Sequence, residues 1–199
     1  MSPAEAENSS ELLQWSYFST KIKLDKIHPK LSLRETFSPR FKSNLSELDV
    51  LLLRNEIFYE HNDNFTSSLG YDFYGIFNDS NRVENRLAEQ FLYKKDLNKR
   101  WSFTSRIRLE ERFQTDFDLR LRNRFGLSYK VNPKTRIVFA DEIFQSFLGG
   151  QYLEQNRINL GLERKISEKL KVTLTYLLQQ FFSDDELNHV IVTRFNFSL

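Results

Sequence analysis

Hydrophobic and polar residues alternate with a period of two along most of the chain, most regularly between Phe117 and Val131. One parity there holds Phe117, Leu119, Leu121, Phe125, Leu127, Tyr129 and Val131, interrupted by Asn123, and the other holds Asp118, Arg120, Arg122, Arg124, Gly126, Ser128 and Lys130. A helix would mix the two sets on every turn, whereas a β-strand sends them to opposite faces. The pattern therefore predicts a strand with one apolar and one charged face.

The same alternation recurs along the chain, so we predict eleven recognisable strands. They cover about residues 14–24, 30–42, 49–61, 65–77, 83–94, 101–113, 117–131, 135–148, 157–163, 171–179 and 188–199. Most are about twice as long as a strand in a soluble sheet and close to the length of a tilted membrane strand. No linker divides the 199 residues. We therefore predict a flexible segment at 1–13 and a single β-barrel domain at 14–199.

Compact turns and longer polar loops alternate between these strands. We predict turns at 26–29, 61–64, 95–99, 132–134 and 167–169, and loops at 43–49, 78–82, 149–154 and 183–188, with a short connection at 114–116. Bacterial outer-membrane barrels show this alternation, and they have an even strand number with both termini on the periplasmic side. The prediction is an all-β, closed antiparallel up-and-down transmembrane barrel of 10–12 strands. Twelve is favoured because it is even.

Alternation alone leaves open which face points inward. The charged face is dense in arginine beside carboxylates, which suits a confined network where planar guanidinium groups each pair with several partners. We therefore predict that this face lines the lumen and that the apolar face meets lipid. The predicted lumen network is Glu84, Arg86, Arg106, Arg108, Glu110, Arg112, Arg120, Arg122, Arg124, Glu142, Arg157 and Glu163. The alternative is a soluble barrel that carries an apolar ligand, with the apolar parity lining a cavity.

Aromatic residues and composition bear on the same choice. Tyr93, Trp101, Tyr129 and Tyr176 are expected near turns or strand ends, where lipid-facing barrels carry aromatic girdles. The net charge of +2 provides no field to attract nucleic acid, and the absence of cysteine excludes disulfides and thiolate metal sites. The first ten residues lack the charged and apolar regions of a secretory signal, which favours a mature form behind an added Met or a cytosolic protein.

The end of the chain is the most specific local feature, because Phe195, Phe197 and Leu199 share one face of a terminal strand. This looks like the signal by which outer-membrane barrels are recognised for assembly, although that signal usually ends in Phe or Trp. The expected partners are outer-membrane lipid and the barrel-assembly machinery, and the expected location is the bacterial outer membrane.

Four segments resemble a bacterial family known only as a domain of unknown function, whose members look like small outer-membrane barrels. These segments are Asp118–Phe125, Gln155–Leu162, the turn Lys165–Leu170 and Asn188–Ile191. The resemblance covers roughly residues 14–199 and rests on periodic motifs. It implies a fold and a location, and it supplies no activity, cofactor or catalytic residue.

No catalytic constellation is recognisable. Outer-membrane phospholipases and deacylases resemble one another in placing Ser two residues from His, and none of His28, His61 and His189 has that neighbour. The carboxylate pairs 110–111 and 141–142 point to opposite faces within each pair, so neither acts jointly on one substrate. The strand geometry turns the arginine row away from the interleaved aromatic residues, which argues against a nucleic-acid stacking platform. We expect no metal, no cofactor and no enzyme, with a lipid-modifying enzyme as a weaker alternative.

These observations predict a barrel with a structural, adhesive or narrow-channel role, because long side chains occupy much of a lumen of this strand number. A wide general porin is not expected. If a solute passes, the arginines of the lumen would favour anions, namely Arg106, Arg108, Arg120, Arg122, Arg124 and Arg157.

Overall fold

The computed structural model describes residues 12–43, 46–77, 81–148, 152–183 and 186–199. In these ranges the chain forms no α-helix and eleven strands: β1 (Leu12–Lys23), β2 (Leu31–Lys42), β3 (Glu47–Glu60), β4 (Phe65–Ile76), β5 (Arg82–Asp96), β6 (Trp101–Phe113), β7 (Phe117–Asn132), β8 (Thr135–Ser146), β9 (Leu153–Lys165), β10 (Leu170–Phe181) and β11 (Leu187–Ser198). The eleven predicted segments coincide with these strands. Most of the predicted flexible segment, residues 1–11, lies outside the described residues, and Leu12 and Leu13 belong to β1.

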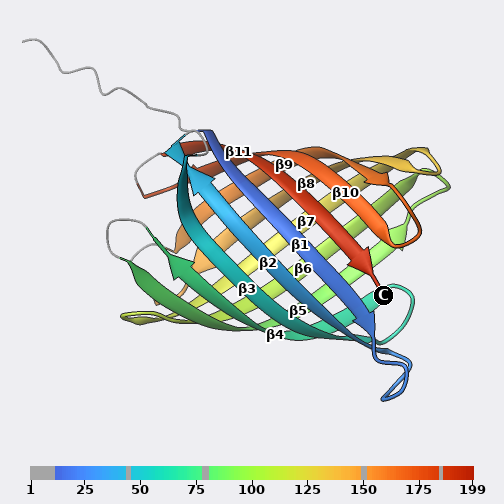
Figure 1. Ribbon diagram of the computed structural model, residues 1–199, viewed down its shortest axis with the longest axis horizontal. Coiled ribbons are helices and arrows are strands. Elements are labelled where there is room, and N and C mark those ends of the chain that lie inside the picture. Colours follow the sequence, from blue (N-terminus) through green and yellow to red (C-terminus); the bar gives the residue numbers. More distant parts are fainter. Residues whose placement is uncertain (1–11, 44–45, 78–80, 149–151, 184–185) are drawn as a thin grey trace, which may run out of the picture.

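The strands form one closed barrel in which each strand pairs with its sequence neighbours (Figure 1). All these neighbouring pairs are antiparallel, and β1 closes the sheet against β11 in parallel, from Leu12 opposite His189 to Lys21 opposite Ser198. We call this pairing the seam. None of the described segments is a helix long and apolar enough to cross a membrane.

The prediction of a twelfth strand and of a purely antiparallel closure is wrong. Eleven strands alternate in direction along the chain, so the first and last run the same way, and an odd-numbered sheet closes only through a parallel pair. Parallel strands form evenly spaced, slanted hydrogen bonds that allow this closure. The expectation that both termini share one end is wrong for the same reason. Leu12 lies where β11 begins, and Leu199 follows β11 at the opposite end, where its N–H donates to the carbonyl of Lys21.

The connections separate into two ends of the barrel. The turn end carries 24–30, 61–64, 97–100, 133–134 and 166–169 together with Leu199, and at the loop end lie the starts of β1, β3, β5, β7, β9 and β11 and the ends of β2, β4, β6, β8 and β10. Asparagine side chains close several turns: Asn62 Oδ1 accepts from the N–H groups of residues 64 and 65, and Asn98 Oδ1 from those of residues 100 and 101. Side-chain bonds to the backbone two or three residues on are a common way to fix a tight turn.

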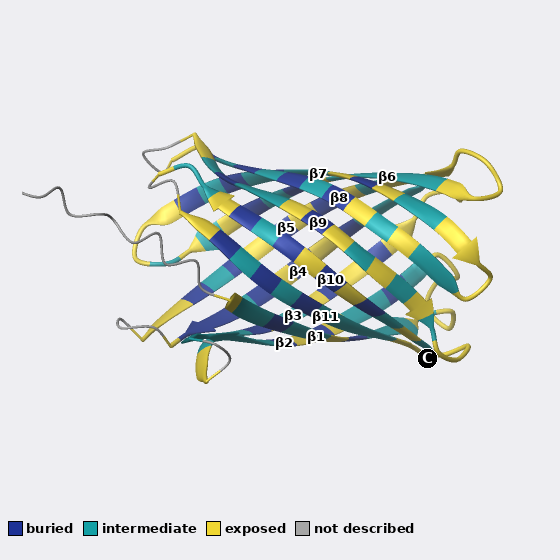
Figure 2. Cartoon of the chain, turned by 90° about the horizontal axis from the view of Figure 1, so that it is seen from above, coloured by how far each residue is buried: buried dark blue, intermediate teal, exposed yellow. Residues whose placement is uncertain are grey.

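The apolar parity faces outward. Most large hydrophobic side chains of the strands are exposed, including Leu69 at 59% and Leu160 at 56%, while Arg108, Glu110 and Asp72 on the other parity are at 0 to 1%. Figure 2 shows the resulting checkered pattern, in which buried residues alternate with intermediate or exposed ones along much of the sheet. This arrangement is the reverse of what a carrier with an apolar cavity requires.

Two small apolar clusters interrupt the polar interior on the loop-end side. One lies at the seam and its neighbours and consists of Trp15, Leu177, Val190 and Val192. The other consists of Leu52, Tyr74 and Ile76 on β3 and β4. The Tyr17 side chain packs against both clusters, so β1 links the two apolar areas across β2.

We predict that Gly161→Ala destabilises the barrel. A Cβ at Gly161 would lie 2.5 Å from the carbonyl oxygen of Leu174 and 2.9 Å from Thr175 Cα, so the backbone of β10 has to move. Overpacking of this kind costs about 1–3 kcal/mol. Gly75→Ala is the matched control, because its Cβ would approach only aromatic side chains, the nearest atom being in the Phe77 ring at 3.3 Å. Urea unfolding in detergent should show a lower midpoint for Gly161→Ala alone, and equal midpoints would contradict the prediction.

Candidate functional site

The candidate site is the charged inner face of the barrel. Even-numbered residues point inward along β5 to β8, and odd-numbered residues point inward along β9, because side chains alternate along a strand. The structure places all the residues of the predicted network on this face: Glu84, Arg86, Arg106, Arg108, Glu110, Arg112, Arg120, Arg122, Arg124, Glu142, Arg157 and Glu163. Ion pairs join nine of them, and Arg124, Arg157 and Glu163 form none with a described residue.

Arg108 bridges distant strands. Its guanidinium group donates to Glu56 on β3 (2.7 Å), to Asp72 on β4 (2.8 Å) and to Glu110 on β6 itself (2.9 Å). To reach β3 and β4 from β6, the side chain passes over β5, where the inner residue Ala88 is small and pairs with Gly70. Small residues at these two positions leave the space that the Arg108 and Glu56 side chains fill.

Glu110 is the acidic centre of the network and has no exposed area. One oxygen accepts from Arg108 (2.9 Å) and Arg122 (2.6 Å), and the other accepts from Arg120 (2.6 Å). Arg86 lies 3.5 Å from the second oxygen. Four guanidinium groups from β5, β6 and β7 therefore share one buried carboxylate.

Further ion pairs extend this centre in three directions. Toward the loop end, Arg112 pairs with Glu84 (2.6 Å) and Asp118 (3.0 Å). Toward β8, Glu142 accepts from Arg106 (2.5 Å) and Arg122 (2.9 Å). Toward β3 and β9, the remaining pairs are Arg54 with Asp72 at 2.6 Å and Arg120 with Glu154 at 3.0 Å. The network thus links seven consecutive strands from β3 to β9.

Forming this network contributes little to stability, but breaking it is costly. Desolvation of the charged groups opposes their attraction, so intact buried ion pairs contribute little net stability. Removal of one partner leaves its neighbours buried and unpaired, which costs about 3–5 kcal/mol. Complete neutralisation is therefore the condition on which these charges are tolerated inside the barrel.

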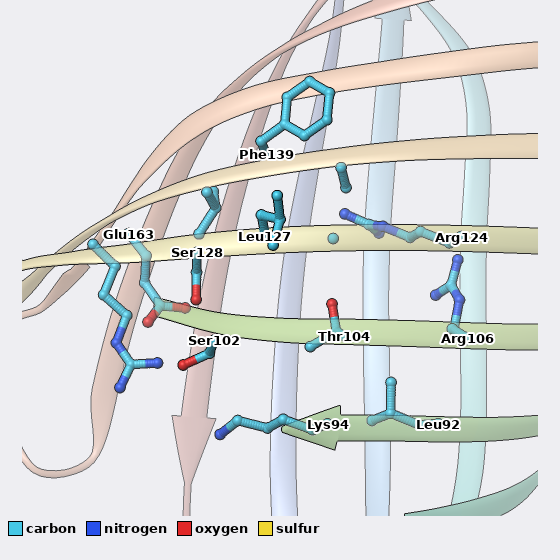
Figure 3. Close-up of a pocket in the computed structure, with 14 residues that line it drawn as sticks. Leu92, Lys94, Ser102, Thr104, Arg106, Arg124, Leu127, Ser128, Phe139 and Glu163 are labelled. Atoms are coloured by element: carbon cyan, nitrogen blue, oxygen red, sulfur yellow. The ribbon is translucent and has the colours of Figure 1, made fainter. Parts of the chain in front are cut away.

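The inner side chains line several cavities. Near mid-barrel, two cavities of about 200 and 230 Å³ share Tyr17, Arg54, Arg122 and Arg157 as walls. A larger cavity of about 650 Å³ lies at the loop end. Figure 3 shows the cavity of about 290 Å³ near the turn end, with Arg106 and Arg124 extending from neighbouring strands.

Other inner-face arginines form no ion pair with a described carboxylate, among them Arg34, Arg40, Arg124, Arg157 and Arg194. We call these five the unpaired arginines. Four of them lie over aromatic rings instead; Arg34 packs on Phe58 and Arg157 on both Trp15 and Phe144. Arg108, Arg120 and Arg122, which were expected from the sequence to favour anions if a solute passes, are each paired with carboxylates, whereas the unpaired arginines are not.

Sequence reasoning missed several members of the interior. They are Arg54, Glu56, Asp72, Asp118 and Glu154 in the ion-pair network, and Arg34, Arg40 and Arg194 among the unpaired arginines. The same parity rule that selected Glu110 applies to Glu56 and Asp72, so their inward position was available from the alternation. Their partners were not, because those lie two or three strands away.

Residues predicted for the outer face have varied positions. Phe195 and Phe197 point outward from β11, where Phe195 stacks on Phe18 with ring centroids 5.1 Å apart. Leu199 follows the strand and is 69% exposed. Tyr176 is not near a strand end as expected. It lies in the middle of β10, and its hydroxyl group forms a hydrogen bond with the His189 ring.

One of the three histidines, His61, lies beside a serine side chain. His61 Nε2 lies 2.8 Å from Ser67 Oγ on the outer side of the turn end, a contact that the spacing rule did not anticipate. A nucleophile and base pair needs a third group that orients the base, and no side-chain hydrogen bond to His61 Nδ1 is present among the described residues. The described part of the chain also contains no group of three or more acidic or histidine side chains suited to a metal.

The fold and the interior define a closed eleven-stranded β-barrel with an ion-paired lumen and an apolar outer face. The chain belongs to the family described as protein of unknown function (DUF2490), which matches residues 14–189. No curated protein matches the chain. The predicted resemblance to a family of unknown function is confirmed.

We predict that Glu110→Gln lowers the free energy of unfolding by about 3–5 kcal/mol, because four arginines lose a shared counter-charge. Glu163→Gln removes the same charge from an inner-face residue without an ion pair and is the matched control. Urea titration of both variants in detergent micelles measures the difference. An unfolding midpoint for Glu110→Gln equal to that of the control would show that the network does not stabilise the barrel.

Proposed function

We propose that the protein is a small barrel of the bacterial outer membrane whose ion-paired lumen gives it a structural role and excludes ordinary solutes. The observation that carries this proposal is the orientation of the two faces: apolar side chains outside, and buried, paired charges inside. Water would not favour an exterior of this kind, because exposed apolar patches on soluble monomers are usually limited to a few hundred Å².

Strand length supports the proposal. The strands contain 12 to 16 residues. A strand of 12 residues is about 40 Å long and covers about 28 Å at the tilt of about 45° that is typical of membrane strands, close to the hydrocarbon thickness of about 30 Å. Closure of the sheet removes every free edge, which a membrane-spanning sheet requires.

Aromatic residues at both ends of the outer face also support it. At the turn end, Trp101 and Tyr129 pack together at 4.9 Å between ring centroids, and Tyr59 and Tyr93 lie on the same rim. At the loop end the ring pairs are Phe113 with Phe117 and Phe147 with Tyr152. Aromatic belts at the two interfaces are typical of membrane barrels.

Carboxylates interrupt the outer face, among them Glu35, Glu89, Glu111 and Asp141. Asp141 Oδ1 is buried and has no hydrogen-bond partner among the described residues. Acidic residues on the lipid face are less costly than Lys or Arg, and the cost falls toward the interfaces. In the proposed orientation the turn end is periplasmic, since outer-membrane barrels have short periplasmic turns.

The lumen favours a structural role over general diffusion. Arg108 crosses from β6 to β3 and β4, and Glu110 gathers arginines from three strands. These bridges leave cavities of about 200 to 290 Å³ through most of the interior. Liposomes containing the protein should therefore exclude sugars, and swelling in sucrose at the rate of an open porin would contradict the structural role.

The two tryptophans test the membrane location. Trp101 is 41% exposed on the outer face, and Trp15 is 5% exposed inside. Each single Trp→Phe variant leaves one reporter, since the chain has two tryptophans. In vesicles of brominated phospholipid, the Trp15→Phe protein should lose much of its Trp101 fluorescence, because bromine quenches by contact. The Trp101→Phe protein should change little.

Extraction gives an independent readout of the same prediction. A membrane barrel should require detergent for purification and should migrate faster on gels before heating than after. If both variants remain monomeric in plain buffer and show no quenching by brominated lipid, the membrane proposal fails.

A further inference from the structure

The inner surface of the barrel is electrostatically divided. All the carboxylates that form ion pairs inside it come from β3 to β9. The inner positions of β1, β2, β10 and β11 carry no Asp or Glu at all. Arg34 and Arg40 on β2 and Arg194 on β11 nevertheless point inward on this side, and Arg157 on β9 lies against it.

Aromatic rings of β1 hold three of these arginines together. The guanidinium carbons of Arg40 and Arg157 lie 4.5 and 4.8 Å from the Trp15 ring centroid. Arg40 also donates to the Tyr17 hydroxyl group (3.2 Å), and Arg194 lies 5.1 Å from the Tyr17 ring centroid. Cation–π contacts orient guanidinium groups without neutralising them. The three positive charges therefore converge around two rings.

The cluster borders two cavities inside the barrel. Tyr17 and Arg157 line both mid-barrel cavities, of about 200 and 230 Å³, with Arg40 on the first and Arg194 on the second. At about 30 Å³ per water molecule, each cavity has room for an anion the size of phosphate with part of its hydration shell. We call this pair of cavities the arginine chamber.

Donor groups at the chamber lack acceptors. The Nε atoms of Arg40 and Arg106 are buried, and neither has a hydrogen-bond partner in the described residues. Arg157 donates Nε to Gln155 (3.0 Å), and Arg194 donates one terminal nitrogen to Thr175 (3.3 Å). A guanidinium group has five donor hydrogens, so most of the donor hydrogens of these arginines have no acceptor among the described side chains.

Such a cluster opposes folding unless a counter-charge is bound. Like charges in a confined, partly desolvated space repel one another, and a buried donor without an acceptor costs about 1–3 kcal/mol. Arginine forks match the oxygens of carboxylates and phosphates. Three carboxylates border the chamber, Glu84 on the first cavity and Glu56 and Glu142 on the second, and each is already paired with an arginine of the ion-pair network.

We propose that the arginine chamber binds a small oxyanion, a phosphate or carboxylate group, against Arg157, which borders both cavities, with Arg40 as the second arginine in one cavity and Arg194 in the other. The two rings of Trp15 and Tyr17 set the orientation of the guanidinium groups, and the anion supplies the counter-charge that Glu110 and Glu142 supply to the arginines of the ion-pair network. This proposal rests on the inner face alone and holds whether or not the outer face meets lipid.

The test uses Trp15 as a reporter in the full-length Trp101→Phe protein, purified in detergent. Inorganic phosphate is titrated at constant ionic strength against chloride, with acetate in a parallel arm. We expect a saturable change in Trp15 emission with the oxyanion and none with chloride alone. If phosphate gives a saturable change and acetate does not, the ligand is a phosphate group. If acetate gives a saturable change, the ligand is a carboxylate. No saturable change with either would overturn the proposal.

Charge-neutralising variants show whether the arginines carry the binding. Arg157→Gln should weaken the oxyanion at least about tenfold, since a hydrogen bond to a charged group contributes about 1.5–3 kcal/mol. Arg164→Gln is the matched control, because it removes the same charge from an exposed outer position of the same strand. If both variants weaken oxyanion binding equally, the loss of net charge explains the effect, and the proposed site is wrong.

Unfolding measurements separate binding from a structural role. Without oxyanion, Arg157→Gln should be at least as stable as the parent protein, since it relieves repulsion. Saturating phosphate should raise the unfolding midpoint of the parent and leave that of Arg157→Gln unchanged, because a ligand that binds only the folded state stabilises it by mass action. Loss of stability in Arg157→Gln without oxyanion, with no phosphate effect on the parent, would overturn the proposal.

Discussion

Neutralisation of charge inside a closed sheet is the constraint on which the rest of this structure depends. The alternating pattern places long charged side chains inside the barrel, where most of them are withdrawn from bulk water. Glu110 meets this constraint most fully, since four arginines surround one carboxylate with no exposed area. Because every member has partners on other strands, the network also fixes how β3 to β9 sit around the lumen.

Alternation made the strands and their two faces predictable, because parity needs only the order of residues along one strand. It predicted the inward position of Arg108 and Glu142 and the outward position of Phe125. The number of strands and the way the sheet closes were harder to predict from the sequence. The even number was inferred from the usual all-antiparallel rule, whereas the seam between β1 and β11 is parallel. Nothing within either strand distinguishes a parallel from an antiparallel partner on that edge.

Partner identity was the other limit. Arg120 and Arg124 lie four residues apart on the same face of β7, and the sequence treats them alike. In the structure Arg120 pairs with Glu110 and Glu154, and Arg124 pairs with no described carboxylate. The difference arises from which residues neighbouring strands bring to the same height, and that depends on register around the whole barrel. A list of inward residues therefore does not separate a neutralised arginine from an unpaired one.

The seam explains why the unpaired arginines gather where they do. Trp15, Leu177, Val190 and Val192 fill inner positions beside it with apolar side chains, and a carboxylate buried among them without a partner would be costly. The strands next to the closure consequently carry no Asp or Glu on their inner faces. The guanidinium groups that reach this side of the barrel pack against aromatic rings instead. Cation–π contacts orient these groups but leave their charge in place. An apolar closure on one side and an ion-paired wall on the other thus leave an excess of arginine between them, and the proposed oxyanion would balance that excess.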